Sequence, residues 1–239
     1  MNDARRHFEV AVNAEALALA WTRQEGAPAG AVVSVDHEIS PRGRLGRLWP
    51  HAQERTAVIA MVWRPTLRAD EADLAWVAAS LGLREAAQAL LGGGAAGTWW
   101  PDIVVDADER RVGEVRAEVQ LGPGRVSSAV ITARLDLDAL PGVGRDAAIT
   151  AMIAGLGAGS EHLDGGHDEL RAAYSRSCVL IGRRVTARLL PRGAARGAVG
   201  GIDQLGRLEL VSATGLVERV PVVSLDRLDV VATPRTLTK

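Results

Sequence analysis

The most informative part of this sequence is Arg42-Gly43-Arg44-Leu45-Gly46-Arg47-Leu48-Trp49, which we call the arginine loop. Three guanidinium groups within six residues repel one another unless an anion lies among them. The two glycines allow the backbone to approach such an anion closely. The stretch has too much glycine for a helix and too many arginines for a core. It predicts a phosphate-binding loop, and a solvated surface turn is the alternative that the residues leave open.

The composition excludes several classes of protein. The chain has 239 residues, 47% of them apolar and 24% charged, with a formal charge of -1. This balance excludes a disordered chain and the basic field that nonspecific duplex binding needs, so we expect no nucleic-acid partner. No apolar run reaches the roughly 18 residues of a membrane helix, and we expect no membrane segment. The single cysteine, Cys178, cannot build a disulfide framework and favours a cytoplasmic location.

Residues 1–174 mix helical and strand patterns, which predicts an α+β domain. Helical spacing predicts helices over residues 13–25, 70–91, 146–156 and 168–174. Apolar and β-branched runs predict strands over residues 31–35, 56–63, 102–105, 113–121 and 126–137. From residue 175 the chain turns to short β-rich runs separated by turn glycines, which suits a small β-barrel over residues 175–239.

Residues 41–49 resemble the GRGRxGRxW loop of biotin protein ligases and depart from it only at Pro41. Other segments resemble motifs of this family in the same order along the chain. They are Asn13 at the end of STN, 26–30 for GAPxG, 61–65 for the strand ending in LRP, 100–105 for the end of KWPNDIVV, 111–113 for the next strand, and 174–185 and 197–203 for the barrel. The resemblance implies a biotin/lipoate ligase catalytic domain of the class II synthetase type, followed by an SH3-like barrel.

The resemblance also implies a reaction and a site. Biotin and ATP would give biotinyl-AMP and pyrophosphate with Mg²⁺ on the phosphates, and a lysine of a biotin carboxyl-carrier protein would then attack the adenylate. The substrate- and ATP-binding positions implied are Arg42, Gly43, Arg44, Gly46, Arg47, Trp49, Trp100, Pro101, Asp102 and Gly113. We assign no catalytic residue and no metal ligand, and a homodimer stays open.

Several departures from the family motifs fall at the same implied site. Trp99 stands where KWPND has its active-site lysine, and the only lysine of the chain is Lys239. The GIL motif appears as Glu114-Val115-Arg116, GIGxN as residues 132–136 with Arg134, and QT as Glu38-Ile39. A rebuilt biotin pocket is therefore predicted. Two hypotheses follow: a ligase that adenylates biotin or a related carboxylate, and an inactive paralogue, a pseudoenzyme, that binds a ligand or a protein.

Three other features have simpler interpretations. His162 and His167 permit a metal site, but a polar loop between two helices explains them equally well, and we favour the loop. His37 and His51 flank the arginine loop without a clear role as bases. Cys178 precedes an apolar run and is predicted to be a small buried residue.

Overall fold

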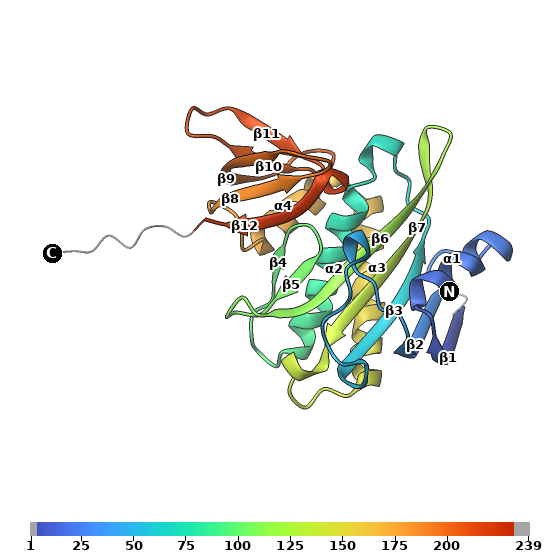
Figure 1. The fold of residues 1–239 in the computed structure, drawn as a ribbon. Helices are drawn as coiled ribbons and strands as arrows, with labels where there is room; N and C mark the ends of the chain where they lie inside the picture. Colours follow the sequence, from blue (N-terminus) through green and yellow to red (C-terminus); the bar gives the residue numbers. More distant parts are fainter. Residues whose placement is uncertain (1–3, 232–239) are drawn as a thin grey trace.

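The chain folds into two β-sheets and four α-helices over residues 4–231, the part that the computed structural model describes (Figure 1). The helices are α1 (Ala14–Gln24), α2 (Leu74–Leu90), α3 (Arg145–Gly165) and α4 (His167–Ser177). The first sheet contains β1 (Arg5–Ala11), β2 (Val32–Glu38), β3 (Thr56–Trp63), β4 (Gly97–Trp99), β5 (Ile103–Val105), β6 (Arg111–Gly122) and β7 (Arg125–Asp136). The second contains β8 (Arg184–Leu189), β9 (Ala194–Ile202), β10 (Leu208–Val211), β11 (Val217–Val220) and β12 (Leu225–Val230).

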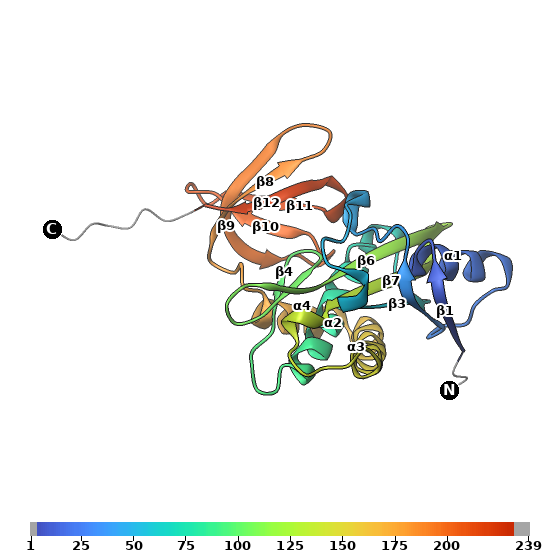
Figure 2. The same ribbon diagram turned by 60° about the horizontal axis from the view of Figure 1, so that its bottom comes forward.

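The first sheet has the strand order β1-β2-β3-β7-β6-β5-β4, in which only β1 and β2 are parallel neighbours. α2 and α3 pack on one face, and α1 packs on the other against β2, β3 and β7 (Figures 1 and 2). β3 is an unbroken apolar run because both of its faces are covered. Side chains of β6 and β7 that point away from α2 and α3 lie beneath the arginine loop.

Most predicted elements of the first sheet are present. β3 has the predicted range, and α1 begins where the Asn13 side chain caps it by accepting a hydrogen bond from Ala16 N–H (2.7 Å). β1 was not predicted, because its charged and apolar residues alternate in the manner of an edge strand and no turn signal marks its ends.

The prediction of a polar loop between the last two helices is wrong. α3 continues to Gly165, and only Gly166, with φ of 135°, separates it from α4. The helix persists through its polar turn because Leu163 is buried and Gly159 lies against the Ala78 carbonyl of α2. α4 then runs to Ser177, three residues past its predicted end at 174.

The second sheet is antiparallel, with the order β11-β10-β9-β8-β12. The predicted closed barrel over residues 175–239 is not formed by these pairings, because no ladder within the described residues joins β11 to β12. The sheet is tied to the rest of the protein at several points. Trp100 Nε1 donates to the Gly206 carbonyl (3.3 Å), and Val222 N–H donates to Asp73 Oδ2 (2.9 Å).

α2 and α3 cross at two facing glycines. A Cβ atom on Gly155 would lie 2.2 Å from the Gly82 carbonyl oxygen, and one on Gly82 would lie 2.4 Å from the Gly155 carbonyl oxygen. Both contacts are with backbone, which cannot move aside as a side-chain end can. The close approach of these helices therefore depends on glycine at both positions.

We expect Gly155→Ala to lower the free energy of unfolding by about 1–3 kcal/mol, because the added methyl forces the two helices apart. Gly157→Ala is the matched control, since a Cβ there meets nothing within 4 Å. It should raise stability by about 0.5–1 kcal/mol through helix propensity. Urea denaturation measures both changes, and equal effects at the two positions would contradict the packing argument.

Candidate functional site

The arginine loop connects β2 to β3 as a compact turn. Gly43 N–H donates to the Arg47 carbonyl (2.8 Å), which closes the loop on itself. Leu45 and Gly46 have φ values of 57° and 70°, in the left-handed region that favours glycine. The role of Gly46 is therefore to allow this turn.

Arg44 is held by two different parts of the protein. Its side chain is buried, and Nε donates to Asp102 Oδ2 (3.2 Å). Its Nη1 and Nη2 donate to the backbone carbonyls of Leu225 and Asp226, at the start of β12. All three nitrogens of this guanidinium thus have acceptors within the chain.

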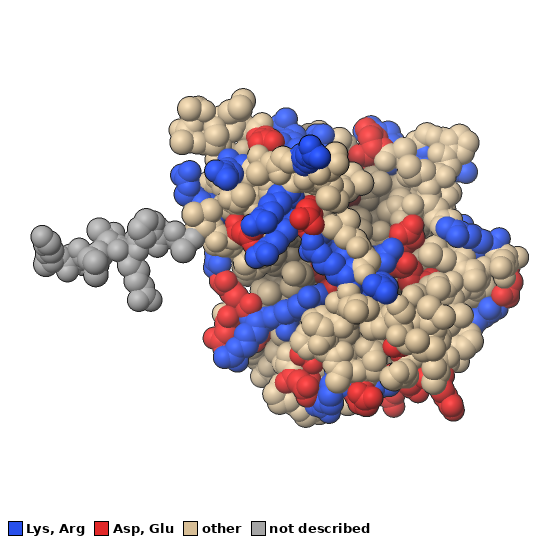
Figure 3. All heavy atoms as spheres, viewed as in Figure 1, with Lys and Arg blue, Asp and Glu red and all other residues tan. Residues whose placement is uncertain are grey.

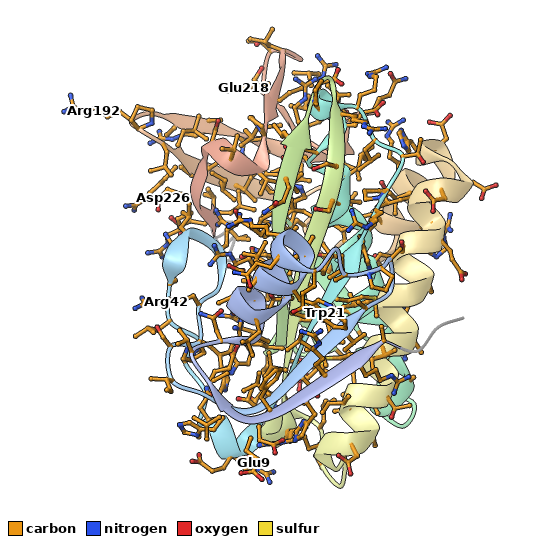
Figure 4. The ribbon with its side chains drawn as sticks, turned by 90° about the vertical axis from the view of Figure 1, so that its right-hand side faces the viewer. Glu9, Trp21, Arg42, Arg192, Glu218 and Asp226 are labelled. Atoms are coloured by element: carbon orange, nitrogen blue, oxygen red, sulfur yellow. The ribbon has the colours of Figure 1, made fainter. Side chains whose placement is uncertain are left out.

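The other two loop arginines point in different directions. Arg47 Nη2 donates to Asp226 Oδ1 (2.7 Å), an exposed contact with β12. Arg42 turns back on its own loop, where it donates to Ser40 Oγ (3.0 Å) and to the Gly46 carbonyl (2.9 Å). Figure 4 shows Arg42 on the loop and Asp226 on the neighbouring strand. The three guanidiniums do not converge on one point, so no single anion is clasped by all of them.

A cavity of about 340 Å³ lies where the arginine loop, the segment between β4 and β5, and β12 meet. It is lined by Arg44, Arg47, Leu48, Pro50, Trp99, Trp100, Pro101, Asp102, Ile103, Arg111, Glu114, Leu225, Arg227 and Leu228. Five residues implied by the resemblance are in this wall, namely Arg44, Arg47, Trp100, Pro101 and Asp102. Basic and acidic side chains are interleaved across the face of the molecule that carries β12, rather than gathered by sign (Figure 3).

The remaining implied residues lie outside the cavity wall. Arg42, Gly43 and Gly46 shape the loop, as described above. Trp49 is buried and donates through Nε1 to Thr56 Oγ1 (2.8 Å). Gly113 packs inside the sheet, where a Cβ would lie 2.7 Å from the Arg134 carbonyl oxygen.

A buried ion pair lies beneath the arginine loop. Arg134 of β7 is 1% exposed, and Glu38 at the end of β2 is 1% exposed. Arg134 Nε lies 2.8 Å from Glu38 Oε2 and Arg134 Nη2 3.0 Å from Glu38 Oε1, so the two groups make a two-pronged contact. Glu38 Oε1 also accepts from Ala14 N–H (2.8 Å), which fixes the start of α1.

Glu114 extends this pair into a cluster. Its Oε1 lies 3.6 Å from Arg134 Nη1, and its Oε2 accepts from Arg111 Nη2. A Cβ on Gly43 would lie 2.7 Å from both Glu114 carboxylate oxygens, so the loop rests directly on this carboxylate. Glu38, Glu114 and Arg134 are among the positions at which the sequence departs from the ligase motifs. Each departure is visible in the sequence, but their mutual pairing is not.

Burial raises the pKa of two carboxyls at the site. For Glu114, burial outweighs the opposing effect of the Arg111 and Arg134 guanidiniums. For Asp102, burial outweighs the opposing effect of Arg44 and Arg111. Both carboxyls therefore favour the protonated form more strongly than they would in water.

The described residues contain no group of three or more His, Cys, Asp or Glu side chains that could hold a metal ion. His162 and His167 each lie near a single glutamate, Glu85 (3.6 Å) and Glu71 (3.9 Å) respectively. Cys178 is buried, as predicted, and burial raises the pKa of its thiol. Within residues 4–231, none of the helices combines the length and the apolar character needed to cross a bilayer.

The fold is that of biotin protein ligases, as comparison with solved structures shows. The biotin protein ligase from Aquifex aeolicus in complex with biotin and ATP superposes with a TM-score of 0.75 at 14% identity, over 97% of this chain and 100% of that one. A biotin protein ligase-like protein of unknown function from Silicibacter sp. TM1040 matches with a TM-score of 0.69 at 16% identity, over 90% and 94%.

A third similar structure is the biotin acetyl coenzyme A carboxylase synthetase from Helicobacter pylori with bound biotinylated ATP. It has a TM-score of 0.60 and 12% identity, over 91% of this chain and 100% of that one. No protein-family model matches the chain, and no curated protein sequence matches it. At these identities the likeness establishes the fold and leaves the chemistry to be argued from the site.

We expect Arg134→Met to lower the free energy of unfolding by about 3–5 kcal/mol, because it leaves the Glu38 carboxylate buried without its partner. The double variant Glu38→Gln with Arg134→Met should recover most of this loss, since the charge is removed while an acceptor for Ala14 N–H stays. Chemical denaturation of both variants measures this. A double variant as unstable as the single one would contradict the assignment of the cost to the unpaired charge.

The raised pKa of Glu114 predicts a dependence of stability on pH. Because the folded protein holds the Glu114 proton more tightly than the unfolded chain does, this group stabilises the folded protein at low pH. That contribution is fully present below the ordinary pKa of 4.5 and is lost as the pH rises through the folded-state pKa. Glu114→Gln removes this titration, so we expect the variant to gain stability relative to the natural protein between pH 4.5 and pH 8. Urea unfolding across this range measures the difference.

Glu161→Gln at an exposed position of α3 is the control, and as a surface change it should alter stability little at any pH. A difference between Glu114→Gln and the natural protein that stays constant with pH would contradict the raised pKa.

Proposed function

We propose that this protein binds a small anionic ligand in the cavity beside the arginine loop and does not transfer biotin to a carrier. The observation that carries this proposal is the buried Glu38–Arg134 pair with Glu114 beside it. By resemblance, Glu114 stands at the glycine of GIL, which lies against the acyl group, Arg134 stands in the glycine-rich GIGxN strand, and Glu38 stands at the QT pair. Here the surface beneath the arginine loop carries charged side chains in contact with one another.

The energetic cost of clearing that surface opposes biotin binding. An uncharged acyl group beneath the arginine loop would have to separate Arg134 from Glu38, and breaking one buried pair costs about 3–5 kcal/mol. That cost corresponds to a loss of roughly 10² to 10⁴ in affinity. The residues beneath the loop therefore do not fit biotin in the manner of a ligase.

The charge needed for adenylation is also reduced. Trp99, at the place of the family lysine, lines the cavity with an indole. The described residues contain no lysine, and Lys239 lies outside them. Losing one preorganised donor of this kind costs about 10² to 10³ in rate. Arg44 does not replace it, because its nitrogens already donate to Asp102 and to β12.

The cavity itself fits a small anion with an apolar part. Its volume of about 340 Å³ is near the lower end for ligand pockets, and its walls combine tryptophan and leucine with arginine. Arg47 and Arg227 are more than half exposed and their carboxylate partners are partly exposed, so an incoming anion can compete with those carboxylates for the two arginines at little cost. Adenosine monophosphate, with one phosphate and one flat base, has this chemistry.

A second candidate function is adenylation of biotin or a related carboxylate, followed by transfer to a carrier protein. The motif order and the convergence of Arg44, Arg47 and Asp102 at one cavity favour it. ATP and biotin are the ligands of the Aquifex ligase complex, and for this chain they belong to this candidate. Mg²⁺ would bind through phosphate oxygens, since the described residues offer no three-ligand group.

Other features that the sequence predicts belong to the proposal as well. They are a division of the chain near residue 174, a cytoplasmic location and, for the second candidate, a carboxyl-carrier partner or a homodimer.

Calorimetry with adenosine monophosphate and with biotin, together with an assay of pyrophosphate release from Mg²⁺-ATP, biotin and a carrier domain, tests the proposal. We expect the nucleotide to bind, biotin not to bind, and pyrophosphate release to stay at the level of an Arg44→Ala blank. Arg47→Ala should weaken nucleotide binding about fivefold or more, as loss of a charged hydrogen bond does. Arg23→Ala, at an exposed arginine in the last turn of α1 that is not part of the cavity wall, should leave it unchanged.

Trp99→Lys separates the two candidates. If only the missing ammonium prevents adenylation, this variant should release pyrophosphate in the presence of biotin. We expect no gain, because the Glu38–Arg134 pair still occupies the surface beneath the loop. Turnover by the natural protein or by Trp99→Lys above the blank would favour the ligase function over the one proposed.

A further inference from the structure

We infer that Arg134 and Arg116 are positioning residues that hold the arginine loop closed over the sheet, so that the loop needs no bound ligand to fold. The inference concerns the regulation of the site under the proposed function, but its evidence is the loop's own contacts.

Arg134 supplies the first hold on the loop. Two of its nitrogens are fixed by Glu38, and the third, Nη1, donates to the Arg42 carbonyl (3.1 Å). Because both charged groups are buried, the guanidinium cannot rotate away without leaving charges unpaired. The donor that meets the loop is therefore fixed in place by the ion pair.

Arg116 supplies the second hold, on the next carbonyl. Its Nη1 donates to the Gly43 carbonyl (3.3 Å), while Nε lies 2.8 Å from Glu15 Oε2 in the first turn of α1. Burial raises the pKa of Glu15, and the Arg116 charge opposes that rise. Two successive loop carbonyls are thus bound by two arginines from neighbouring strands.

Two further contacts prevent the loop from lifting. Glu114 meets Gly43 from the sheet side, at a distance that leaves no room for a side chain. On the other side Arg44 is buried between Asp102 and the carbonyls of β12. The loop is therefore bound by residues of the first sheet and by residues of the second sheet. All of these partners belong to the chain itself.

This arrangement changes what ligand binding requires. A loop that folds only around its ligand must lose conformational entropy at that moment, which weakens binding. Here that ordering belongs to folding of the protein. A ligand that enters the cavity beside the loop therefore does not have to order the loop as it binds.

Hydrogen exchange on the ligand-free full chain, read by mass spectrometry over residues 40–49, tests the inference. We expect the loop amides to exchange at least about 100-fold more slowly than an unstructured peptide, since Gly43 N–H and Gly46 N–H are bonded within a fixed turn. The double variant Glu38→Gln with Arg134→Met should accelerate exchange in the loop about tenfold and leave β3 unchanged.

Arg171→Met is the matched control, because Arg171 also donates to a backbone carbonyl, that of Ile202, but far along the chain from the loop. It should leave loop exchange unchanged. Arg116→Met removes the contact with the Gly43 carbonyl at a partly exposed residue, and it should accelerate loop exchange about threefold. This variant also tests the inference if the double variant does not fold.

Fast loop exchange in the natural protein, or no acceleration in either Arg134 or Arg116 variants that fold, would overturn the inference. Neither result depends on any ligand. The proposed function can therefore fail in the calorimetric test while this inference stands, and this inference can fail while the calorimetric test supports the proposed function.

Discussion

The structure around the site depends on one constraint, that a charge buried in the sheet must have a partner. Arg134 and Glu38 meet this constraint for each other, and the rest follows from their positions on β7 and β2. Glu38 also accepts a hydrogen bond from Ala14 N–H in the first turn of α1, and Arg134 also donates one to the Arg42 carbonyl of the arginine loop. One pair thus fixes the relative positions of a helix, two strands and a loop.

The arginine loop shows how a basic segment can satisfy its own need for anions. Arg44 and Arg47 have acidic partners in Asp102 and Asp226, and carbonyl oxygens complete the set. The sequence predicts a phosphate-binding loop and leaves a solvated turn open. The fold supplies acceptors to Arg44 from residues 58 to 182 positions away in the chain.

Local pattern accounts for what could be predicted. The apolar run of β3 and the β-branched runs of β6 and β7 each carry their signal within a few residues. The continuous helix through Gly159 carries none, because a glycine there has meaning only against the Ala78 carbonyl of another helix. The same reason hid the site cluster. Glu38 and Arg134 are 96 residues apart, and neither is unusual by itself.

The backbone fold and the chemistry of the side chains at the site are therefore two separate properties, and the fold alone does not determine the chemistry. The fold of biotin protein ligases extends over 97% of the chain. The side chains beneath the loop depend on one another: glycine at 134 would leave Glu38 buried without its partner, and any residue other than glycine at 43 would collide with Glu114. Mutually dependent charges of this kind keep the side chains beneath the loop in place, because separating one pair leaves its members buried without a partner.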